Sequence, residues 1–388
     1  MNNTKMNSSE NVFENTLTPE KSLKEPGIIR YYNDHLNLSI KWILKSIRGS
    51  GGSSAYFSLL GWSKPYPETT GYIIPTLINY SRKQEEPGRI LRSAESLGEW
   101  LLSIQKSKGF WNAGVHKNNN QEKPSVFNTA QILKGMASLH LETGDSKWIE
   151  AGYKGAKWLS DNLTPDGIWE IGNYRGKFNP SYYTQVAWPM LEIWNLTNDD
   201  KIKAAAVRVL DRILKLQLDN GAFKGWSFDD HKPAFTHTIA YTLRSFQESA
   251  RILNQYDKYE KPLRKILDHF IRNSELNNGR IPGAFYYDLK PVRSYSCLTG
   301  NVQLAICLMN YYQQTSDLRI LNAAAKTIDF VCSKQAASNI ISGLNGAVAG
   351  STPLRGRYMM YRYPNWAAKY LADALMKIIS ILKKEGLS

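Results

Sequence analysis

The sequence of 388 residues is poor in cysteine and lacks long apolar runs. Its three cysteines, Cys297, Cys307 and Cys332, are odd in number and lie in apolar, helix-like segments. Such cysteines are typical of buried thiols, so we expect neither a disulfide framework nor a zinc site. No apolar run reaches about 18 residues, and we therefore expect no membrane-spanning helix.

Common metal and phosphate motifs are also missing. The chain has no His-x-x-x-His pair, no Cys-x-x-Cys pair and no calcium loop, so we expect no metal and no cofactor. Asp229, Asp230 and His231 offer oxygen and nitrogen ligands, but three adjacent side chains converge on one ion only through an unusual turn. The glycine-rich segment 49–54 lacks the Lys-Ser or Lys-Thr ending of a phosphate-binding loop.

The chain is strongly basic, with 49 lysines and arginines against 34 aspartates and glutamates, a formal net charge of +15. This balance indicates an anionic partner. Nucleic acid would require a recognisable module, and no helix-turn-helix, zinc-finger or RNA-binding signature is present, so we expect no nucleic acid. An acidic polysaccharide or oligosaccharide is the partner we favour, and peripheral association with a membrane surface through lysines stays open.

The beginning of the chain differs from the rest in composition. Residues 1–26 are rich in Asn, Ser, Thr, Glu and Lys and contain no apolar stretch like that of a signal peptide. We expect residues 1–27 to form a disordered lead and residues 28–388 to form a single domain. Without a signal peptide, the expected location is the cytoplasm.

A helix opening recurs six times along the chain, at spacings of 59, 55, 54, 61 and 68 residues. Five of the six copies carry a threonine at the same place. A hydroxyl there can accept a hydrogen bond from the free amides of the first helical turn. The aligned residues are Thr70, Thr129, Thr184, Thr238, Thr299 and, in the sixth copy, Ala367.

A second kind of helix lies between these openings. Its apolar residues recur at steps of three and four, which predicts an amphipathic helix with one buried face. Most copies are followed by a glycine that can close a helix or turn with a positive φ. These helices are predicted over 37–47, 89–105, 148–162, 201–217, 259–275 and 318–335, and the glycines are Gly109, Gly167, Gly221, Gly279 and Gly343.

Two helices per repeat cannot bury their apolar faces alone, so the six units must stack, either as an open solenoid or as a closed ring. We favour the ring, because open solenoids usually have shorter loops and a polar cap at each end. The more charged second set would lie outside and the threonine-led set inside. The predicted fold is all-α, an (α/α)6 toroid of six helix hairpins.

This pattern resembles the (α/α)6 toroids of carbohydrate-active enzymes. The segment Tyr66-Pro67-Glu68-Thr69-Thr70-Gly71-Tyr72-Ile73-Ile74-Pro75-Thr76 is similar to the opening of bacterial polysaccharide-biosynthesis proteins of the VpsJ type. Terpene cyclases share the toroid, and segments 105–111 and 217–223 resemble their glutamine and aromatic turn motif. The chain lacks the DxDD and DDxxD runs of that chemistry, so a terpenoid cyclase-like toroid is only an alternative. The resemblance implies a fold more than a reaction.

The loops before the inner helices should surround one mouth of the ring, where six positive helix ends meet. Their aromatic side chains can stack on sugar rings, and their arginines can pair with carboxylates. Packing of the aromatics onto the barrel is the alternative. The predicted substrate-binding residues are Trp62, Trp111, Trp169, Arg175, Trp226, Tyr287, Arg293 and Arg357.

Four residues are candidates for catalysis: Glu68, Tyr72, His237 and Asp229. Glu68 lies beside the rigid Tyr66-Pro67, and Tyr72 follows it by one helical turn. His237 has the nearly equivalent position in the fourth repeat, and we expect it to have a near-neutral pKa suited to proton transfer. A carboxylate that only favours the helix dipole and a structural histidine are the alternatives.

The ring predicts which of these residues meet. Repeats one and four lie opposite each other in a ring of six, so their side chains can reach one ligand from opposite walls. We therefore expect a shared cleft formed by Glu68, Tyr72, His237, Arg175, Tyr287, Arg293 and Arg357.

Three function classes fit these residues. The first is lyase or epimerase chemistry on an acidic glycan in bacterial polysaccharide biosynthesis or modification, which the basic charge favours. The second is a glycoside hydrolase with two carboxylates roughly 5 to 9 Å apart, such as Glu68 and Asp229. The third is a glycan-binding or assembly subunit without catalysis.

Overall fold

The structure is a computed structural model that describes residues 23, 25–49, 51–117, 121–174, 176, 178–229, 231–337 and 343–387. Most of the predicted N-terminal lead and the predicted site residue Arg175 lie outside these residues. Within them, no helix is long and apolar enough to cross a bilayer. The three cysteines are buried, and none forms a disulfide.

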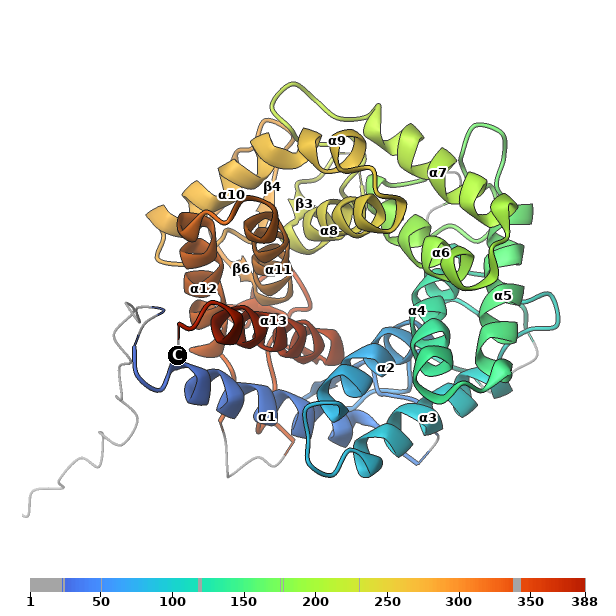
Figure 1. Ribbon diagram of the computed structural model, residues 1–388, viewed down its shortest axis with the longest axis horizontal. Helices are drawn as coiled ribbons and strands as arrows, with labels where there is room; N and C mark the ends of the chain where they lie inside the picture. The colour runs from blue at the N-terminus through green and yellow to red at the C-terminus, as the bar shows by residue number, and fades with distance from the viewer. Residues whose placement is uncertain are drawn as a thin grey trace, which may run out of the picture.

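The described chain forms two concentric rings of helices (Figure 1). The predicted (α/α)6 toroid is confirmed. The inner ring consists of α2 (Pro67–Ser81), α4 (Val126–Thr143), α6 (Thr184–Thr197), α8 (Thr236–Leu253), α11 (Leu298–Thr315) and α13 (Asn365–Lys384). The outer ring consists of α1 (Ile28–Ser46), α3 (Gly88–Ser103), α5 (Ser146–Asp161), α7 (Asp200–Leu214), α10 (Arg264–Leu276) and α12 (Leu318–Cys332).

One predicted helix is interrupted. The segment predicted as a helix over 259–275 contains α9 (Tyr256–Tyr259), a 3-10 turn at Lys261–Leu263 and only then α10. Pro262 explains the break, because proline has no amide hydrogen and its ring clashes with the preceding helical turn. The first helix also begins earlier than predicted, at Ile28.

The outer helices bury one face, as their periodicity predicts. On α7, Ile202, Val209 and Ile213 are buried at helical steps, whereas Lys201 and Arg208 are exposed. The apolar faces of the two rings pack against each other and form the core between them.

Glycines allow two inner helices to touch. A Cβ on Gly71 would lie 2.5 Å from the Cα of Ile132, and one on Gly135 would lie 2.6 Å from the carbonyl oxygen of Gly71. Larger side chains would push α2 and α4 apart, so these glycines set the width of the ring.

The first and last inner helices close the ring. The rings of Tyr72 on α2 and Tyr370 on α13 are 5.8 Å apart. One turn further along, the hydroxyl of Thr76 donates to Asp373 at 2.7 Å. A strand pair at the mouth also joins the first and last repeats, with Phe57 opposite Tyr363. This closure excludes an open solenoid.

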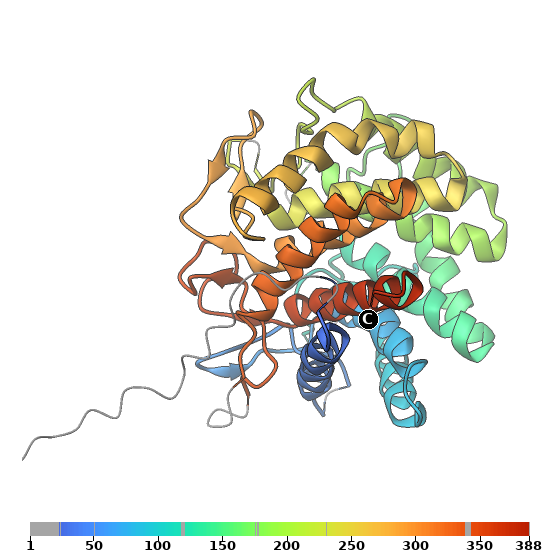
Figure 2. The same cartoon turned by 60° about the vertical axis from the view of Figure 1, so that its left-hand side comes forward.

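Short antiparallel strands lie in the loops that precede inner helices. Figure 2 shows them gathered on the left-hand side of the molecule, which is the mouth. One sheet has the order β2 (Gly61–Trp62), β1 (Tyr56–Ser58), β8 (Tyr363–Pro364). The others are β3 (Ala234–Phe235), β4 (Ala284–Phe285), β5 (Pro291–Val292), and the pair β6 (Ser296–Cys297) with β7 (Ser351–Thr352).

Two of the recurring threonines anchor loops instead of capping helices. The Thr70 hydroxyl accepts from the amide of Ser53 at 3.0 Å, and that of Thr129 accepts from the amide of Trp111 at 3.1 Å. The cap of α4 is Ser125, which accepts from the amide of Asn128. The predicted capping role is therefore wrong for these two threonines, because they lie inside the first turn.

The glycine turns follow the prediction with one exception. Gly109, Gly167, Gly221 and Gly279 have positive φ values of 98°, 73°, 91° and 80°. Gly343 does not serve this role, since Gly346 adopts a φ of 92° in its place. A Cβ on Gly346 would lie 2.2 Å from the carbonyl oxygen of Leu38, so only glycine fits there.

Glutamines at the ends of outer helices hold two of these turns. The side-chain amide of Gln105 donates to the carbonyls of Gly109 at 2.8 Å and Ala151 at 3.0 Å. Gln217 repeats the arrangement with Gly221. Gln105 thus links its turn to α5, and Gln217 links its turn to the 3-10 turn at Lys261–Leu263.

Candidate active site at the mouth

Glu68 lies in the first turn of α2 at the mouth of the ring and is partly exposed. Burial raises its pKa to about 7, and a hydrogen bond from the hydroxyl of Tyr66 opposes part of the shift. Pro67 at the start of α2 restricts the backbone between the two residues. The carboxyl group is thus held in place and changes protonation state near neutral pH.

A closed circuit of ring contacts lies at the same end, and we call it the aromatic circuit. Neighbouring ring centroids are between 4.2 and 6.1 Å apart. Its members come from separate loops and helices, so the circuit ties the repeats together across the mouth. They are, in order, Phe127, Tyr182, Phe228, Phe235, Tyr358, His237 and Tyr241, which returns to Phe127.

Glu68 interacts with this circuit. Its charge helps to raise the pKa of Tyr241 and Tyr358, which belong to the circuit, and of Tyr72 and Tyr370. For Tyr72, Tyr241 and Tyr358 the main cause is burial. The charge of Glu68 therefore acts on buried tyrosines from several inner helices.

Two of the other predicted catalytic residues are connected to Glu68 through aromatic side chains. Tyr72 and His237 both contact rings that Glu68 influences: Tyr370 lies 5.8 Å from Tyr72, and Tyr241 lies 4.2 Å from His237. However, burial lowers the pKa of His237 to about 3. The expected near-neutral pKa is wrong, because the imidazole is shielded from water and stays neutral at pH 7.

Asp229 lies next to the aromatic circuit, one residue after Phe228. It forms an ion pair with Lys232 at 3.3 Å and accepts from the amide of His231 at 3.2 Å. These contacts stabilise a local turn.

The predicted sugar-stacking tryptophans are buried. Trp111, Trp169 and Trp226 have no exposed surface. The indole of Trp111 donates to the carbonyl of Leu101, and that of Trp169 donates to the carbonyl of Leu159. In these positions they fasten loops to the barrel and offer no face to a sugar, which corrects the substrate-binding assignment.

Trp62 is partly exposed and packs against the aromatic rings of Trp42 at 5.0 Å and Phe57 at 5.2 Å. It belongs to the first strand pair at the mouth. One edge of this side chain stays open to solvent.

The remaining predicted binding residues differ in exposure. The hydroxyl of Tyr287 accepts from the amide of Gly225 at 3.0 Å, so this residue holds two loops together. Arg293 and Arg357 are exposed on the loops before α11 and α13. Arg357 directly precedes Tyr358 of the aromatic circuit. Arg175 lies outside the described residues.

Several site residues were missed at the level of sequence. Tyr241 and Tyr370 lie four residues after His237 and Trp366, the same spacing by which Tyr72 follows Glu68. This spacing places a tyrosine one turn deeper on three inner helices. This spacing of four residues is the sequence feature that could have predicted Tyr241 and Tyr370 as site residues.

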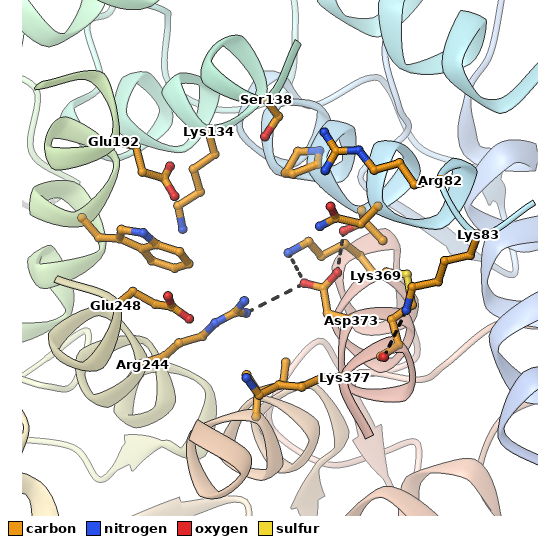
Figure 3. A pocket seen from close by; sticks show the side chains of 16 residues that line it. Arg82, Lys83, Lys134, Ser138, Glu192, Arg244, Glu248, Lys369, Asp373 and Lys377 are labelled. Atoms are coloured by element: carbon orange, nitrogen blue, oxygen red, sulfur yellow. Dashed lines mark hydrogen bonds and ion pairs between the residues drawn. The ribbon is translucent and has the colours of Figure 1, made fainter. Parts of the chain in front are cut away.

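A cavity of about 490 Å³ lies on the other side of these tyrosines, among the inner helices (Figure 3). The ammonium of Lys369, which lines this cavity, is 4.1 Å from the ring centroid of Tyr370 and 5.3 Å from that of Tyr72. Tyr72 and Tyr370 thus separate Glu68 at the mouth from the cavity, which we call the rear cavity.

Comparisons with known proteins agree on the fold. No protein-family model and no curated protein sequence matches the chain. An unsaturated glucuronyl hydrolase specific for heparin has 14% identity and a TM-score of 0.70, covering 91% of this chain and 98% of its own. Cellobiose 2-epimerase from Bacillus thermoamylovorans has 12% identity and a TM-score of 0.73, covering 91% and 99%. A type II terpene cyclase from Scytonema has 13% identity and a TM-score of 0.59, covering 91% and 99%.

These sequence identities of 12 to 14% are too low to show that the chain shares a function with any of these proteins. They show that this chain has the fold of toroidal enzymes, among them carbohydrate-active hydrolases and epimerases. The reaction must be argued from the site itself.

Proposed function

We propose that the chain is a carbohydrate-active enzyme that transfers a proton on an acidic glycan bound at the mouth, with Glu68 as the acid/base group. One observation carries the proposal: Glu68 is partly exposed and has a pKa of about 7. Such a group is present in both protonation states at neutral pH, so it can take a proton from a substrate and return it.

The surroundings of Glu68 support this role. The Tyr66 hydroxyl donates to the carboxyl group and so orients it. Phe127 and Phe228 of the aromatic circuit are partly exposed, and Tyr174, 6.1 Å from Phe228, is 75% exposed. These rings offer faces on which a sugar can stack above the carboxyl group.

The charge around the mouth favours an acidic glycan. Arg293 and Arg357 are exposed on mouth loops, and the whole chain carries a net charge of +15. An arginine can form two parallel hydrogen bonds with a carboxylate. Neutralising the carboxylate of a uronate makes the neighbouring C5 proton easier to remove, because negative charge develops there in the transition state.

The same surroundings favour a lyase or an epimerase over a hydrolase. Hydrolysis requires a second carboxyl group across the scissile bond. Among the described residues, no second carboxylate contributes to the pKa shift of Glu68, and Asp229 is paired with Lys232. The similarity of segment 66–76 to VpsJ-type proteins supports a place in bacterial polysaccharide biosynthesis or modification.

The experiment is an incubation of the protein with acidic and neutral bacterial glycans in deuterated water, followed by NMR and mass analysis. Deuterium at C5 identifies an epimerase, and a new double bond identifies a lyase. A new reducing end without unsaturation would replace the proposal with hydrolysis. Binding without any product would replace it with a glycan-binding protein.

A matched pair of variants tests the role of Glu68. Glu260 also has a pKa raised to about 7 by burial, but it lies beside α9 on the outer side of the ring. We expect Glu68→Gln to lose at least roughly 100-fold in turnover while it still binds glycan. Glu260→Gln should keep wild-type turnover. Full activity in Glu68→Gln would disprove the assignment.

A further inference from the structure

The rear cavity is lined mainly by charged side chains, and cations outnumber carboxylates. Figure 3 shows these side chains converging on the same space from different inner helices. The carboxylates are Glu192, Glu248 and Asp373. The cations are Arg82, Lys83, Lys134, Arg244, Lys369 and Lys377.

The carboxylate of Asp373 interacts with two of the cations. Asp373 accepts from Lys369 at 2.7 Å and pairs with Arg244 at 3.8 Å. It also accepts a hydrogen bond from the hydroxyl of Thr76. The negative charge of Asp373 is therefore shared, and the positive charge of this group is only partly balanced.

Three other charged side chains of the lining have partners of their own. Arg82 donates to Glu142, which does not line the cavity, at 2.8 Å. Lys83 donates to the carbonyl of Met376 at 3.2 Å. Glu248 accepts from Arg251 at 3.2 Å. The six cations of the lining thus share three carboxylates, so positive charge is in excess in the cavity.

Lys134 and Arg244 lie against the same indole. The Lys134 ammonium is 3.5 Å from the ring centroid of Trp188, and the Arg244 guanidinium is 5.3 Å from it. Lys134 is 7% exposed, and the carboxylate of Glu192 in the same cavity is the charge that acts on it most strongly. The Nε atom of Arg244 is buried without a hydrogen-bond partner.

Burying more cations than carboxylates is costly. A buried cation requires a counter-charge, and a buried donor requires an acceptor. Burial also lowers the pKa of Lys369 to about 8 and that of Lys134 well below its ordinary value. An oxyanion placed between Lys134 and Arg244 would offset the excess of positive charge and accept a hydrogen bond from the Nε atom of Arg244.

We propose that the rear cavity is a second binding site, specific for a small hydroxylated anion, namely a sugar that carries a phosphate or a carboxylate group. The oxyanion binds Lys134 and Arg244. The carboxylates of Glu192 and Glu248, in the same cavity, accept from sugar hydroxyls. A volume of about 490 Å³ is typical of small-ligand sites.

This site is independent of the one proposed at the mouth. Tyr72 and Tyr370 lie between Glu68 and the cavity, and Lys369 rests on both rings. A ligand in the rear cavity therefore contacts neither Glu68 nor the aromatic side chains that face the mouth loops. An experiment can therefore contradict the proposal for the mouth and leave the proposal for the rear cavity in place, or the reverse.

The test is isothermal titration calorimetry of the full chain with glucose 6-phosphate, glucuronate and glucose at constant ionic strength. We expect one of the two sugar anions to bind with one-to-one stoichiometry and at least ten times more tightly than glucose. The preferred anion identifies the oxyanion group. Equal binding of all three sugars would overturn the proposal.

Variants locate the binding. Lys134→Gln and Arg244→Gln should each weaken binding of the preferred anion at least tenfold, whereas Glu68→Gln should leave it unchanged. Arg244→Gln also removes an ion pair to Asp373, so its fold must be checked by circular dichroism. Lys134→Gln breaks no ion pair and keeps the test decisive. Unchanged binding in Lys134→Gln, or loss in Glu68→Gln, would overturn the proposal.

Discussion

The two ends of the ring differ although the same six helices form both. At the mouth, aromatic side chains from several loops contact one another, and the charge of Glu68 acts on some of them. At the other end, charged side chains line an open cavity. Burial raises the pKa of Glu68 at the mouth, whereas the rear cavity gathers more cations than carboxylates.

Loop length explains the difference. At the rear end, α4 is followed by α5 after only two residues, Gly144 and Asp145. The turn from α11 to α12 is equally short, Ser316 and Asp317. At the mouth the connections span 277–297 and 333–364. Only the long connections can reach over the axis, so one end closes and the other stays open.

The largest expected effect comes from the rear cavity. Replacing Asp373 with alanine removes the ion-pair partner of Lys369 and Arg244, whose side chains are only 6% and 15% exposed. We expect the free energy of unfolding to fall by about 3 to 5 kcal/mol, measured by urea denaturation.

The control for this variant is Asp161→Ala. Asp161 forms an exposed pair with Lys157 at 2.7 Å, and such pairs contribute little to stability. Its unfolding curve should match the wild type. If Asp373→Ala is equally harmless, the rear cavity is well hydrated and its cations need no partner.

The next effect concerns the mouth and depends on pH. The pKa of Glu68 is about 7 in the folded protein, above the ordinary value of 4.5. Between these values the folded protein keeps a proton that the unfolded chain has lost, so stability falls as pH rises from 4.5 to 7. Glu68→Gln cannot ionise. Relative to wild type it should gain roughly 3 kcal/mol between about pH 4 and pH 8, measured by urea unfolding at both values.

Glu150→Gln is the control, because Glu150 is exposed on the outer helix α5. This variant should keep the wild-type dependence on pH. If Glu68→Gln also kept the wild-type dependence of stability on pH, the mouth would be more hydrated than its aromatic lining indicates.

The contrast between the ends also shows how far the sequence could be interpreted. The ring was predictable, because the threonine openings and glycine turns recur with the helices. Repeats one and four face each other in such a ring, which is why Glu68 and His237 were expected to meet. Pro262 was overlooked, and it breaks the helix that the apolar spacing predicted.

The site was harder to predict for two physical reasons. A tryptophan in a loop has the same sequence signature whether it faces a ligand or, like Trp111, the core. The rear cavity is made of single charged residues on separate helices, such as Lys134, Arg244 and Lys369. Each of these resembles an ordinary surface charge until the ring brings them together.

A smaller effect is expected where a mouth loop is anchored. Thr129→Val keeps the shape of the side chain but removes the acceptor for the amide of Trp111. A buried amide left without a partner costs about 1 to 3 kcal/mol, which thermal unfolding can detect. Thr315→Val is the control, because that hydroxyl is exposed: it donates to a carbonyl of its own helix and accepts from the exposed amide of Asp317 at 3.4 Å, and water can replace it there. Equal stabilities would show that the loop shifts to find another acceptor.

The smallest effect is expected in the short rear turns. Gly144 and Ser316 occupy the same place in two repeats, with φ values of 71° and 56°. A left-handed backbone is strained for serine and not for glycine, so Ser316→Gly should stabilise by about 0.5 to 1 kcal/mol. Gly144→Ser should destabilise by a similar amount, because a Cβ there meets no atom within 4 Å and only backbone strain is added.

Gly109 provides the comparison with the mouth side of the outer helices. A Cβ at Gly109 would lie 2.4 Å from the carbonyl oxygen of Lys154, so Gly109→Ala adds a clash to the strain. Differential scanning calorimetry should therefore show a clearly larger loss for Gly109→Ala than for Gly144→Ser. Equal losses would mean that the glycine turns are as loosely packed as the rear turns, and that packing does not distinguish the two ends of the ring.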